Sequence, residues 1–220
     1  MLYNYAEVTR IYGNDYKLRK AILDGQVFKI ENGIYSDGES NFTTIELILK
    51  KYPNSFLVKD SALHMLGFID EKPPKIHVGT ARNALRITDS RVQQHFYSNL
   101  DVSTLYEYEW ATYAHILNYK NVKRYQSENN NEIRLFNLKA LFYDVLRNYR
   151  KYPKSVLIAI LNKFKTCRYF YGITQWEVEE NLRQENVVSD IEFLDKELYE
   201  AIKEIFDEVW SRDFNIKYDL

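Results

Sequence analysis

Basic side chains are concentrated in a short segment near the N-terminus of the 220-residue chain. Lys17, Arg19 and Lys20 occupy three of four consecutive positions. The apolar residues among and after them recur at helical spacing and face the opposite side: Leu18, Ala21 and Ile22. A helix with cations on its outward face suits contact with nucleic-acid phosphates. The alternative interpretation is an ordinary helix whose lysines are only solvated.

The elements that must position these cations follow the order helix, tight turn, helix and β-hairpin. We predict helices over residues 6–12 and 15–23, and a hairpin whose strands cover 26–30 and 34–35. This order is typical of a winged helix-turn-helix, which presents one helix to the DNA major groove and a hairpin, the wing, to the adjacent backbone. We therefore expect a DNA-binding domain over residues 1–55.

Residues at the ends of these elements support the prediction. Asn14 suits the N-cap of the second helix, because its side chain can accept a hydrogen bond from an amide of the first turn. Gly25 suits the left-handed residue that ends a helix, and Asn32-Gly33 suits a tight hairpin turn. Lys29 would lie on the first strand of the hairpin. The first helix has one apolar face, formed by Val8, Ile11 and Tyr12.

Beyond residue 55 the pattern predicts an α+β domain over residues 56–220. A capping box from Thr43 to Glu46 begins a helix that runs to about Lys51 and leads into this domain. Short segments in which apolar and polar residues alternate predict an antiparallel sheet over about 56–137. Its expected strands are 75–78, 84–88, 92–97, 103–110 and 133–136.

The spacing becomes helical from Leu138 and predicts helices over about 138–210. They are expected to begin near Leu138, Ser155, Thr174 and Ser189. In the second of them the inward residues are predicted to be Val156, Ile160, Leu161 and Phe164. The fold class predicted from the whole chain is α+β: an N-terminal winged helix-turn-helix followed by an antiparallel-sheet domain with C-terminal helices.

The net charge is only −1, but the charges are separated along the chain. Residues 134–168 carry nine Lys or Arg against one acid, Asp144, whereas residues 177–220 carry fourteen acids against five Lys or Arg. A positive block suits nucleic acid, and a negative block suits repulsion, covering or mimicry of nucleic acid. The alternative is a set of solvated helix faces that neutralise one another.

Composition excludes several other classes. The single cysteine, Cys167, cannot form an internal disulfide, which fits a reducing cytoplasm. There is no apolar run of membrane-spanning length and no basic-then-apolar leader, so we expect a cytoplasmic protein with no membrane segment.

Catalytic motifs are also missing from the sequence. It contains no Walker loop, G-x-G-x-x-G, H-E-x-x-H, C-x-x-C or G-x-S-x-G. We therefore expect no catalytic residue, no bound metal and no cofactor. Glu107 and Glu109 share one face of a predicted strand and, with Lys120 or Lys123, loosely resemble a nuclease site, but we interpret them as part of an exposed sheet face. The four histidines are far apart in sequence: His64, His77, His95 and His115.

Residues 61–78 read SALHMLGFIDEKPPKIHV, with Ser-Ala-Leu and Leu-Gly before a proline and an alternating strand. This segment resembles the one that follows the winged head in AbiEi-type antitoxins of abortive-infection (type IV) toxin–antitoxin systems, which act in phage defence. Residues 32–35 are similar to the G-x-Y that closes the hairpin of that family. Residues 135–147 look like the helix that follows the family's sheet. The resemblance covers about residues 5–150.

The resemblance implies a bacterial cytoplasmic protein with two roles. Its head would bind inverted repeats in double-stranded DNA ahead of its own operon and repress transcription. The rest of the chain would counter a nucleotidyltransferase toxin encoded beside it, with no stable complex required. Matched positions imply that Asn14 and Tyr16 meet base edges and that the cations meet phosphates. The implied DNA-binding residues are Arg10, Asn14, Tyr16, Lys17, Arg19, Lys20 and Lys29.

Two other interpretations stay open on the sequence alone. One is a nuclease with a DNA-recognition head, in which Glu109 would serve metal-dependent cleavage. The other is a protein-binding module without DNA contact, whose acidic C-terminal helices hold a basic partner.

Overall fold

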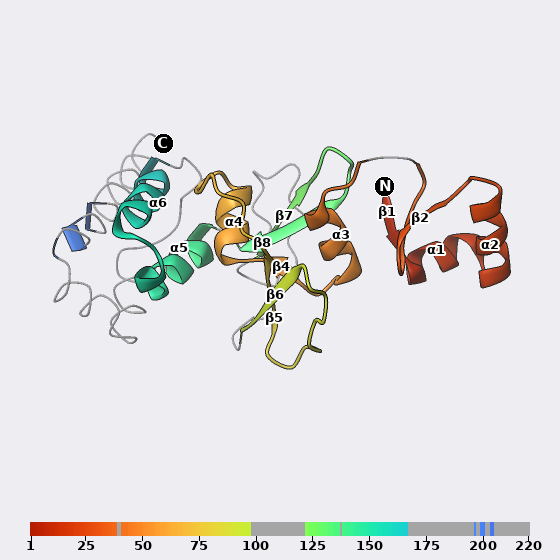
Figure 1. The fold of residues 1–220 in the computed structure, drawn as a ribbon, viewed down its shortest axis with the longest axis horizontal. Helices are drawn as coiled ribbons and strands as arrows, with labels where there is room; N and C mark the ends of the chain where they lie inside the picture. The colour runs from red at the N-terminus through yellow and green to blue at the C-terminus, as the bar shows by residue number, and fades with distance from the viewer. Residues whose placement is uncertain are drawn as a thin grey trace, which may run out of the picture. The chain divides into compact units, whose positions relative to one another are not determined.

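The computed structural model describes residues 1–38, 41–97, 122–136 and 138–166, together with five residues between 196 and 204. The chain has a mixed α+β fold (Figure 1). It divides into two compact units. The first contains Met1–Val58 and Pro74–Leu135, and the second contains Lys59–Pro73 and Phe136–Leu220. The domain boundary expected near residue 55 stays a prediction.

The first unit begins with five short elements and a small antiparallel sheet. They are β1 (Leu2–Asn4), α1 (Tyr5–Tyr12), α2 (Asp15–Leu23), β2 (Phe28–Glu31) and β3 (Ile34–Ser36). The strand order is β1-β3-β2, with both pairs antiparallel. The two helices and the hairpin predicted from the sequence are thus confirmed, while β1 was not predicted.

Local hydrogen bonds define where α1 and α2 begin. Asn4 and Glu7 form a capping box at the start of α1, and the Asn14 side chain accepts a 2.9 Å hydrogen bond from the Lys17 amide at the start of α2. Gly13 separates the helices with φ +90°, and Gly25 follows α2 with φ +68°. Both values lie in a region that favours glycine, which explains the tight turn and the end of the second helix.

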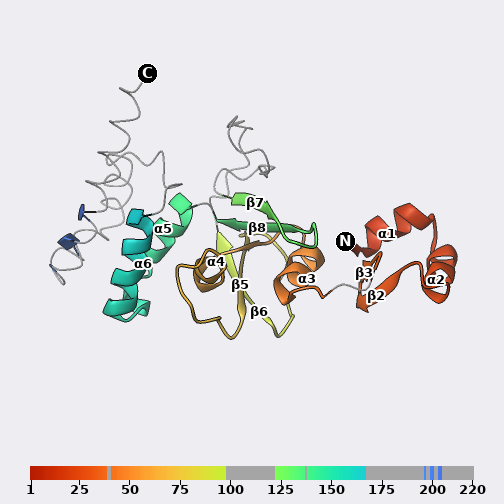
Figure 2. The ribbon, with the colours of Figure 1, turned by 90° about the horizontal axis from the view of Figure 1, so that it is seen from above.

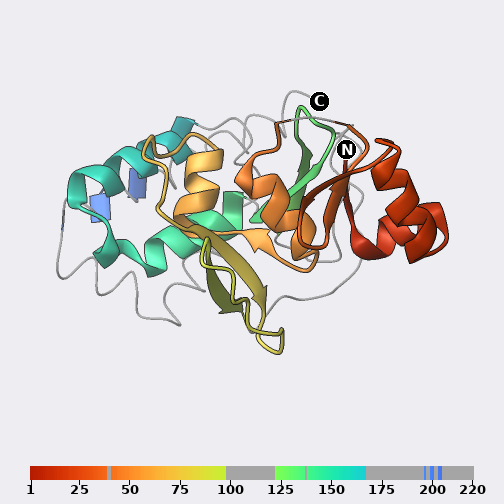
Figure 3. The same ribbon diagram turned by 45° about the vertical axis from the view of Figure 1, so that its right-hand side comes forward.

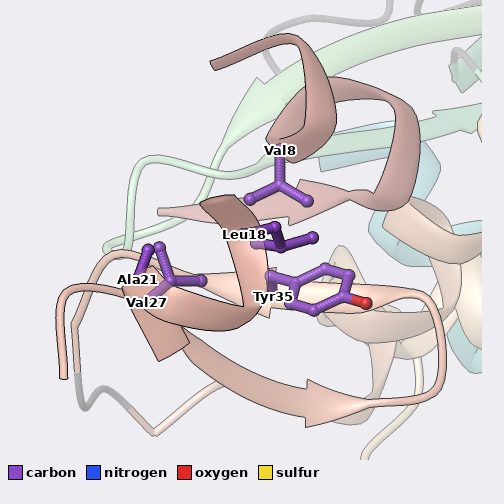
Figure 4. Packing of buried hydrophobic residues seen from close by; sticks show 5 residues of the cluster. All are labelled: Val8, Leu18, Ala21, Val27 and Tyr35. Carbon is purple, nitrogen blue, oxygen red and sulfur yellow. The ribbon is translucent and has the colours of Figure 1, made fainter. Parts of the chain in front are cut away.

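A compact apolar cluster holds the helices against the small sheet. Figure 4 shows the side chains of α1, α2, β3 and the segment before β2 gathering at one point. Its buried members are Val8, Leu18, Ala21, Val27 and Tyr35. Burial of each large side chain contributes about 1.5–3 kcal/mol. Ile11 was expected on the buried face of α1, but it is 59% exposed, because that helix meets the cluster through buried Val8 and partly buried Tyr12.

Helix α3 (Thr44–Lys51) covers β1 and β3 and begins with the predicted capping box at Thr43 and Glu46. The Glu46 carboxylate is 2% exposed and also accepts hydrogen bonds from Ser127 Oγ at 2.5 Å and Asn131 Nδ2 at 2.9 Å. Asn131 Oδ1 in turn accepts the amide of Leu2 at 2.8 Å. One buried carboxylate therefore connects the first strand, α3 and a distant turn.

The larger sheet has the order β6-β5-β4-β8-β7. Its strands are β4 (Phe56–Leu57), β5 (Ile76–Ala81), β6 (Val92–Tyr97), β7 (Val122–Gln126) and β8 (Glu132–Phe136). The antiparallel sheet expected from the sequence is wrong. Pairing of β4 with β5 is antiparallel, but β4 with β8 and β5 with β6 are parallel, so the sheet is mixed.

Individual strand predictions had different outcomes. The strands near 75–78, 92–97 and 133–136 are confirmed, whereas 84–88 is irregular and β7 was missed. Leu85, an apolar residue of the wrongly predicted strand, is 91% exposed. Gly79 on β5 lies against the Phe56 ring, where an added Cβ would come within 2.5 Å of a ring carbon. The predicted strand 103–110 lies outside the described residues.

The second unit packs helices around aromatic rings. It contains α4 (Lys59–Met65), α5 (Leu138–Arg147), a 3₁₀ turn η1 (Tyr149–Lys151) and α6 (Lys154–Thr166), and Figure 2 shows α5 and α6 side by side. Phe164 of α6 contacts Phe68 at a centroid distance of 4.4 Å and Phe142 at 5.2 Å. The helix predicted near Thr174 lies outside the described residues. Of the helix predicted near Ser189, the structure describes only residues 196, 199, 200, 203 and 204, and all five are helical.

One inward residue of α6 was misassigned. Ile160, Leu161 and Phe164 are buried as predicted, but Val156 is 38% exposed and Leu157 is buried in its place. The buried positions Leu157, Ile160, Leu161 and Phe164 follow the i, i+3, i+4, i+7 spacing of one helix face, and Val156 lies at the edge of that face. In the part of the chain that the structure describes, no helix has the length and apolar character needed to cross a membrane.

The Glu46 network generates a pH-dependent prediction. Burial alone would raise the pKa of this carboxyl, but its hydrogen bonds, those from Asn131 and Ser127 foremost, lower the pKa from 4.5 to about 2. Because the folded pKa lies below the unfolded value, the ionised group stabilises the fold above pH 4.5, and this stabilisation is lost as pH falls through 4.5 toward 2. The shift corresponds to about 3 kcal/mol.

We expect Glu46→Gln to lower the free energy of unfolding by about 2–3 kcal/mol at pH 7, measured by urea denaturation, because an amide cannot accept from all of these donors. The difference from wild type should shrink toward pH 2. Glu128→Gln, on an exposed side chain of the same turn, is the control and should change little. Equal losses for both variants would contradict the assignment.

Candidate nucleic-acid interface

The outward face of α2 is strongly basic. Lys17, Arg19 and Lys20 are exposed, while Leu18 and Ala21 between and beside them are buried in the apolar cluster. The sequence prediction of which side chains face outward on this helix is confirmed. Since α2 is packed through its other face, the three cations project from a fixed scaffold rather than from a loop.

Within the described residues, these cations take no part in ion pairs. Among the described residues, no carboxylate lies within ion-pair distance of any of the basic side chains proposed from the sequence: Arg10, Lys17, Arg19, Lys20 and Lys29. Several acids nearby are instead neutralised by other cations. Glu7 pairs with Lys50 at 2.7 Å, and Asp37 pairs with the Met1 amino group at 2.5 Å.

The polar residues at the α1–α2 turn are also exposed. Tyr16 is 78% exposed on the first turn of α2, and Arg10 is exposed on the last turn of α1. The Asn14 oxygen is occupied by the helix cap, so only its amide nitrogen can donate to a ligand. Tyr5 donates a hydrogen bond to Asp15, which ties the start of α1 to the start of α2.

Some features of this surface were not predicted. Ile11 and Leu23 are 59% and 87% exposed and add apolar area beside the basic residues. Apolar spacing is a signal for burial, so the sequence pattern placed Ile11 inside. The exposure of Leu23 could have been predicted from the sequence, because this residue lies one position beyond the apolar face formed by Leu18, Ala21 and Ile22.

The positive block over residues 134–168 proves heterogeneous. Arg134 is 6% exposed and donates hydrogen bonds to the Leu49 and Tyr52 carbonyls at the end of α3, so it does not contribute to a binding surface. The only acid of the block, Asp144, is also buried, and it pairs with Lys59 at 3.4 Å. Burial raises the pKa of this carboxyl, and the Lys59 ammonium opposes the rise.

Four exposed cations of this block lie close together in sequence around η1. We call them the basic turn: Arg147, Arg150, Lys151 and Lys154. The Arg150 guanidinium lies 5.4 Å from the Tyr149 ring centroid and donates a 2.9 Å hydrogen bond to its hydroxyl. Cations interleaved with aromatic rings suit contact with a nucleic-acid backbone.

Other groups considered for chemistry give no metal centre. His77 and His95 lie on neighbouring strands with ring nitrogens 3.1 Å apart, a proximity not predicted from their spacing. Within the described ranges, no group of three or more His, Cys, Asp or Glu side chains is placed to hold a metal ion. Of the residues named for the alternative nuclease site, Glu107, Glu109 and Lys120 lie outside those ranges, as do His115 and Cys167, whereas Lys123 lies on β7.

No protein-family model matches the chain, and no curated protein matches it. What the chain does must therefore be inferred from its own residues.

The cap of α2 gives the prediction for this site. Asn14→Ala should lower the free energy of unfolding by about 1 kcal/mol, because the Lys17 amide loses its partner. Asn14→Ser should retain most of the stability, since a hydroxyl can also cap the helix. Thermal denaturation measures both. If the alanine variant is as stable as wild type, Asn14 does not serve as the cap.

Proposed function

We propose that this chain is a DNA-binding antitoxin that represses its own operon through a winged helix-turn-helix and counters a nucleotidyltransferase toxin in a bacterial cytoplasm. The observation that carries the DNA-binding half is the exposed face of α2, whose cations have no carboxylate partner among the described residues. Unpaired cations on a rigid helix attract a polyanion without first breaking an ion pair.

The arrangement of the elements supports duplex DNA as that polyanion. Helices α1 and α2 are separated by a tight turn, and the antiparallel hairpin β2–β3 follows directly. In winged helix-turn-helix proteins the second helix of the pair enters the major groove and the hairpin meets the flanking backbone. Here α2 carries Lys17, Arg19 and Lys20, and the hairpin carries Lys29.

The individual roles follow from position. Tyr16 and the Asn14 amide, at the N-terminal end of α2, are assigned to base edges, and the cations are assigned to phosphates. Phosphate contacts by five cations, which are Arg10, Lys17, Arg19, Lys20 and Lys29, would give a slope of about −4.5 in a plot of log affinity against log salt concentration.

The antitoxin half of the proposal depends on the order of segments after the head. Helix α4 is followed by Gly67 with φ +73°, then by strand β5, and helix α5 follows strand β8. This order supports the resemblance noted in the sequence. On this proposal, the protein partner is a toxin encoded by the adjacent gene. The operator is a set of inverted repeats upstream of this gene. Expression of that toxin with and without this chain, scored by cell growth, tests this half.

The double variant Lys17→Ala with Arg19→Ala tests the head. With two phosphate contacts gone, affinity for a duplex from upstream of the gene should fall about 10- to 100-fold, and the salt slope should weaken by about 1.8. The melting temperature should hardly change, because both side chains are exposed. Fluorescence anisotropy over a salt series measures the binding.

Lys72→Ala with Lys75→Ala is the matched control, since it removes the same charge from exposed positions outside residues 1–55. It should bind nearly as wild type. Equal affinity of the head variant and wild type would defeat the assignment of α2.

The basic turn yields a separate prediction. Reversing its four charges to Glu should impair operator binding or toxin neutralisation, because a polyanion or an acidic partner would then be repelled. Anisotropy and a growth-rescue assay measure the two outcomes, and neutral Gln replacements at the same positions control for misfolding. If neither activity moves in folded variants, the basic turn is only a solvated face.

A further inference from the structure

The connection between β5 and β6 is unusual for a parallel pair. Parallel neighbours are normally joined through a helix, but residues 82–91, which we call the strap, are irregular (Figure 3). The side chain of Gln94 holds the strap in place: its oxygen accepts the Ile87 amide at 2.7 Å, and its nitrogen donates to the Leu85 carbonyl at 3.0 Å. The strap is therefore an ordered segment.

The end of the strap forms ion pairs with the hairpin β2–β3, which we call the wing. Arg91 forms a two-pronged pair with Glu31 of β2, at 2.9 and 3.1 Å, and a second with Asp89, at 2.7 and 2.9 Å. Lys51 at the end of α3 reaches the same two carboxylates, at 3.4 Å from Glu31 and 3.2 Å from Asp89. Four charges from three separate parts of the first unit thus meet at the turn end of the wing, next to Asn32-Gly33.

A bulge in the wing decides which side chains face this cluster. Lys29 pairs with Tyr35, and Glu31 pairs with Ile34, so Ile30 is the extra residue. Cross-strand partners share a face, and consecutive residues of a strand face opposite sides. Because Tyr35 and Ile34 are consecutive, Lys29 and Glu31 lie on opposite faces. Without the bulge, both would lie on the same face.

The two faces have different neighbours. Tyr35 belongs to the cluster beneath α1 and α2, so Lys29 shares the face that carries the cationic helix. Glu31 faces the strap and α3. Hydrogen bonding to Arg91 lowers the pKa of the Glu31 carboxyl and of the Asp89 carboxyl, so the ionised form of each group is favoured. Two-pronged guanidinium–carboxylate pairs fix geometry as well as charge.

We propose that Arg91 is a positioning residue for DNA contact: through Glu31 and Asp89 it fixes the wing to the strap, so that Lys29 on the opposite face reaches a phosphate. This inference rests on the proposed function, because it assigns the wing a DNA contact. The inference makes Arg91, which lies sixty positions after Glu31 and outside the helix-turn-helix, a determinant of DNA binding.

The experiment uses the full chain and a 30-base-pair duplex from upstream of the gene. Arg91→Gln should weaken binding about 3- to 10-fold and reduce the salt slope by about 1, as Lys29→Ala does. In a Lys29→Ala background, Arg91→Gln should cause no further loss. Arg91→Lys, which keeps the charge but not the fork, should restore part of the affinity. Arg86→Gln, an exposed cation of the same strap, is the control and should bind as wild type.

Hydrogen exchange without DNA provides the second readout. Amides of residues 28–36 should exchange faster in Arg91→Gln, with α6 unchanged. Wild-type wing exchange and salt slope in Arg91→Gln, or losses that add fully to those of Lys29→Ala, would overturn the inference while leaving the α2 assignment intact. If wild type binds no duplex, the proposed function fails, and the exchange result alone then decides whether the strap holds the wing.

Discussion

The buried carboxylate of Glu46 is the constraint on which the first unit depends. Glu46 is the N3 residue of the capping box of α3, and its carboxylate also accepts hydrogen bonds from a turn more than eighty residues later in the chain. Asn131 extends the network to the amide of Leu2, so the first strand of the small sheet is fixed by the same group. A buried charge is tolerated only when fully hydrogen-bonded, which makes the turn between β7 and β8 and the start of α3 mutually dependent.

In the part of the chain that the structure describes, the basic residues of the first unit fall into two classes, those that pair with carboxylates and those that do not. Lys50, Lys51 and Arg91 neutralise carboxylates, whereas the cations of α2 pair with no carboxylate of the described residues. Counting charges along the chain cannot separate these classes. Arg134 makes the same point, because it belongs to the most basic stretch of the sequence and yet lies buried against the end of α3.

Features controlled by neighbouring residues could be read from the sequence, and features controlled by distant ones could not. The caps at Asn14 and Thr43, the turn at Gly33 and the outward cations of α2 depend on a few adjacent positions, and the structure has them where predicted. The direction of strand pairing depends on chain connections, so the mixed sheet was missed. Ile11 and Val156 show the limit of periodicity, because the width of a helix contact is set by the partner it meets.

The Phe56 ring above Gly79 has a consequence for the evolution of this chain. Even alanine at that position would need the ring to move, since the nearest ring carbon would be 2.5 Å from the new methyl group. The two sites should therefore vary together: a side chain can be accepted on β5 only after the aromatic on β4 has become smaller. Among natural variants or in a saturation library, glycine should persist wherever phenylalanine does.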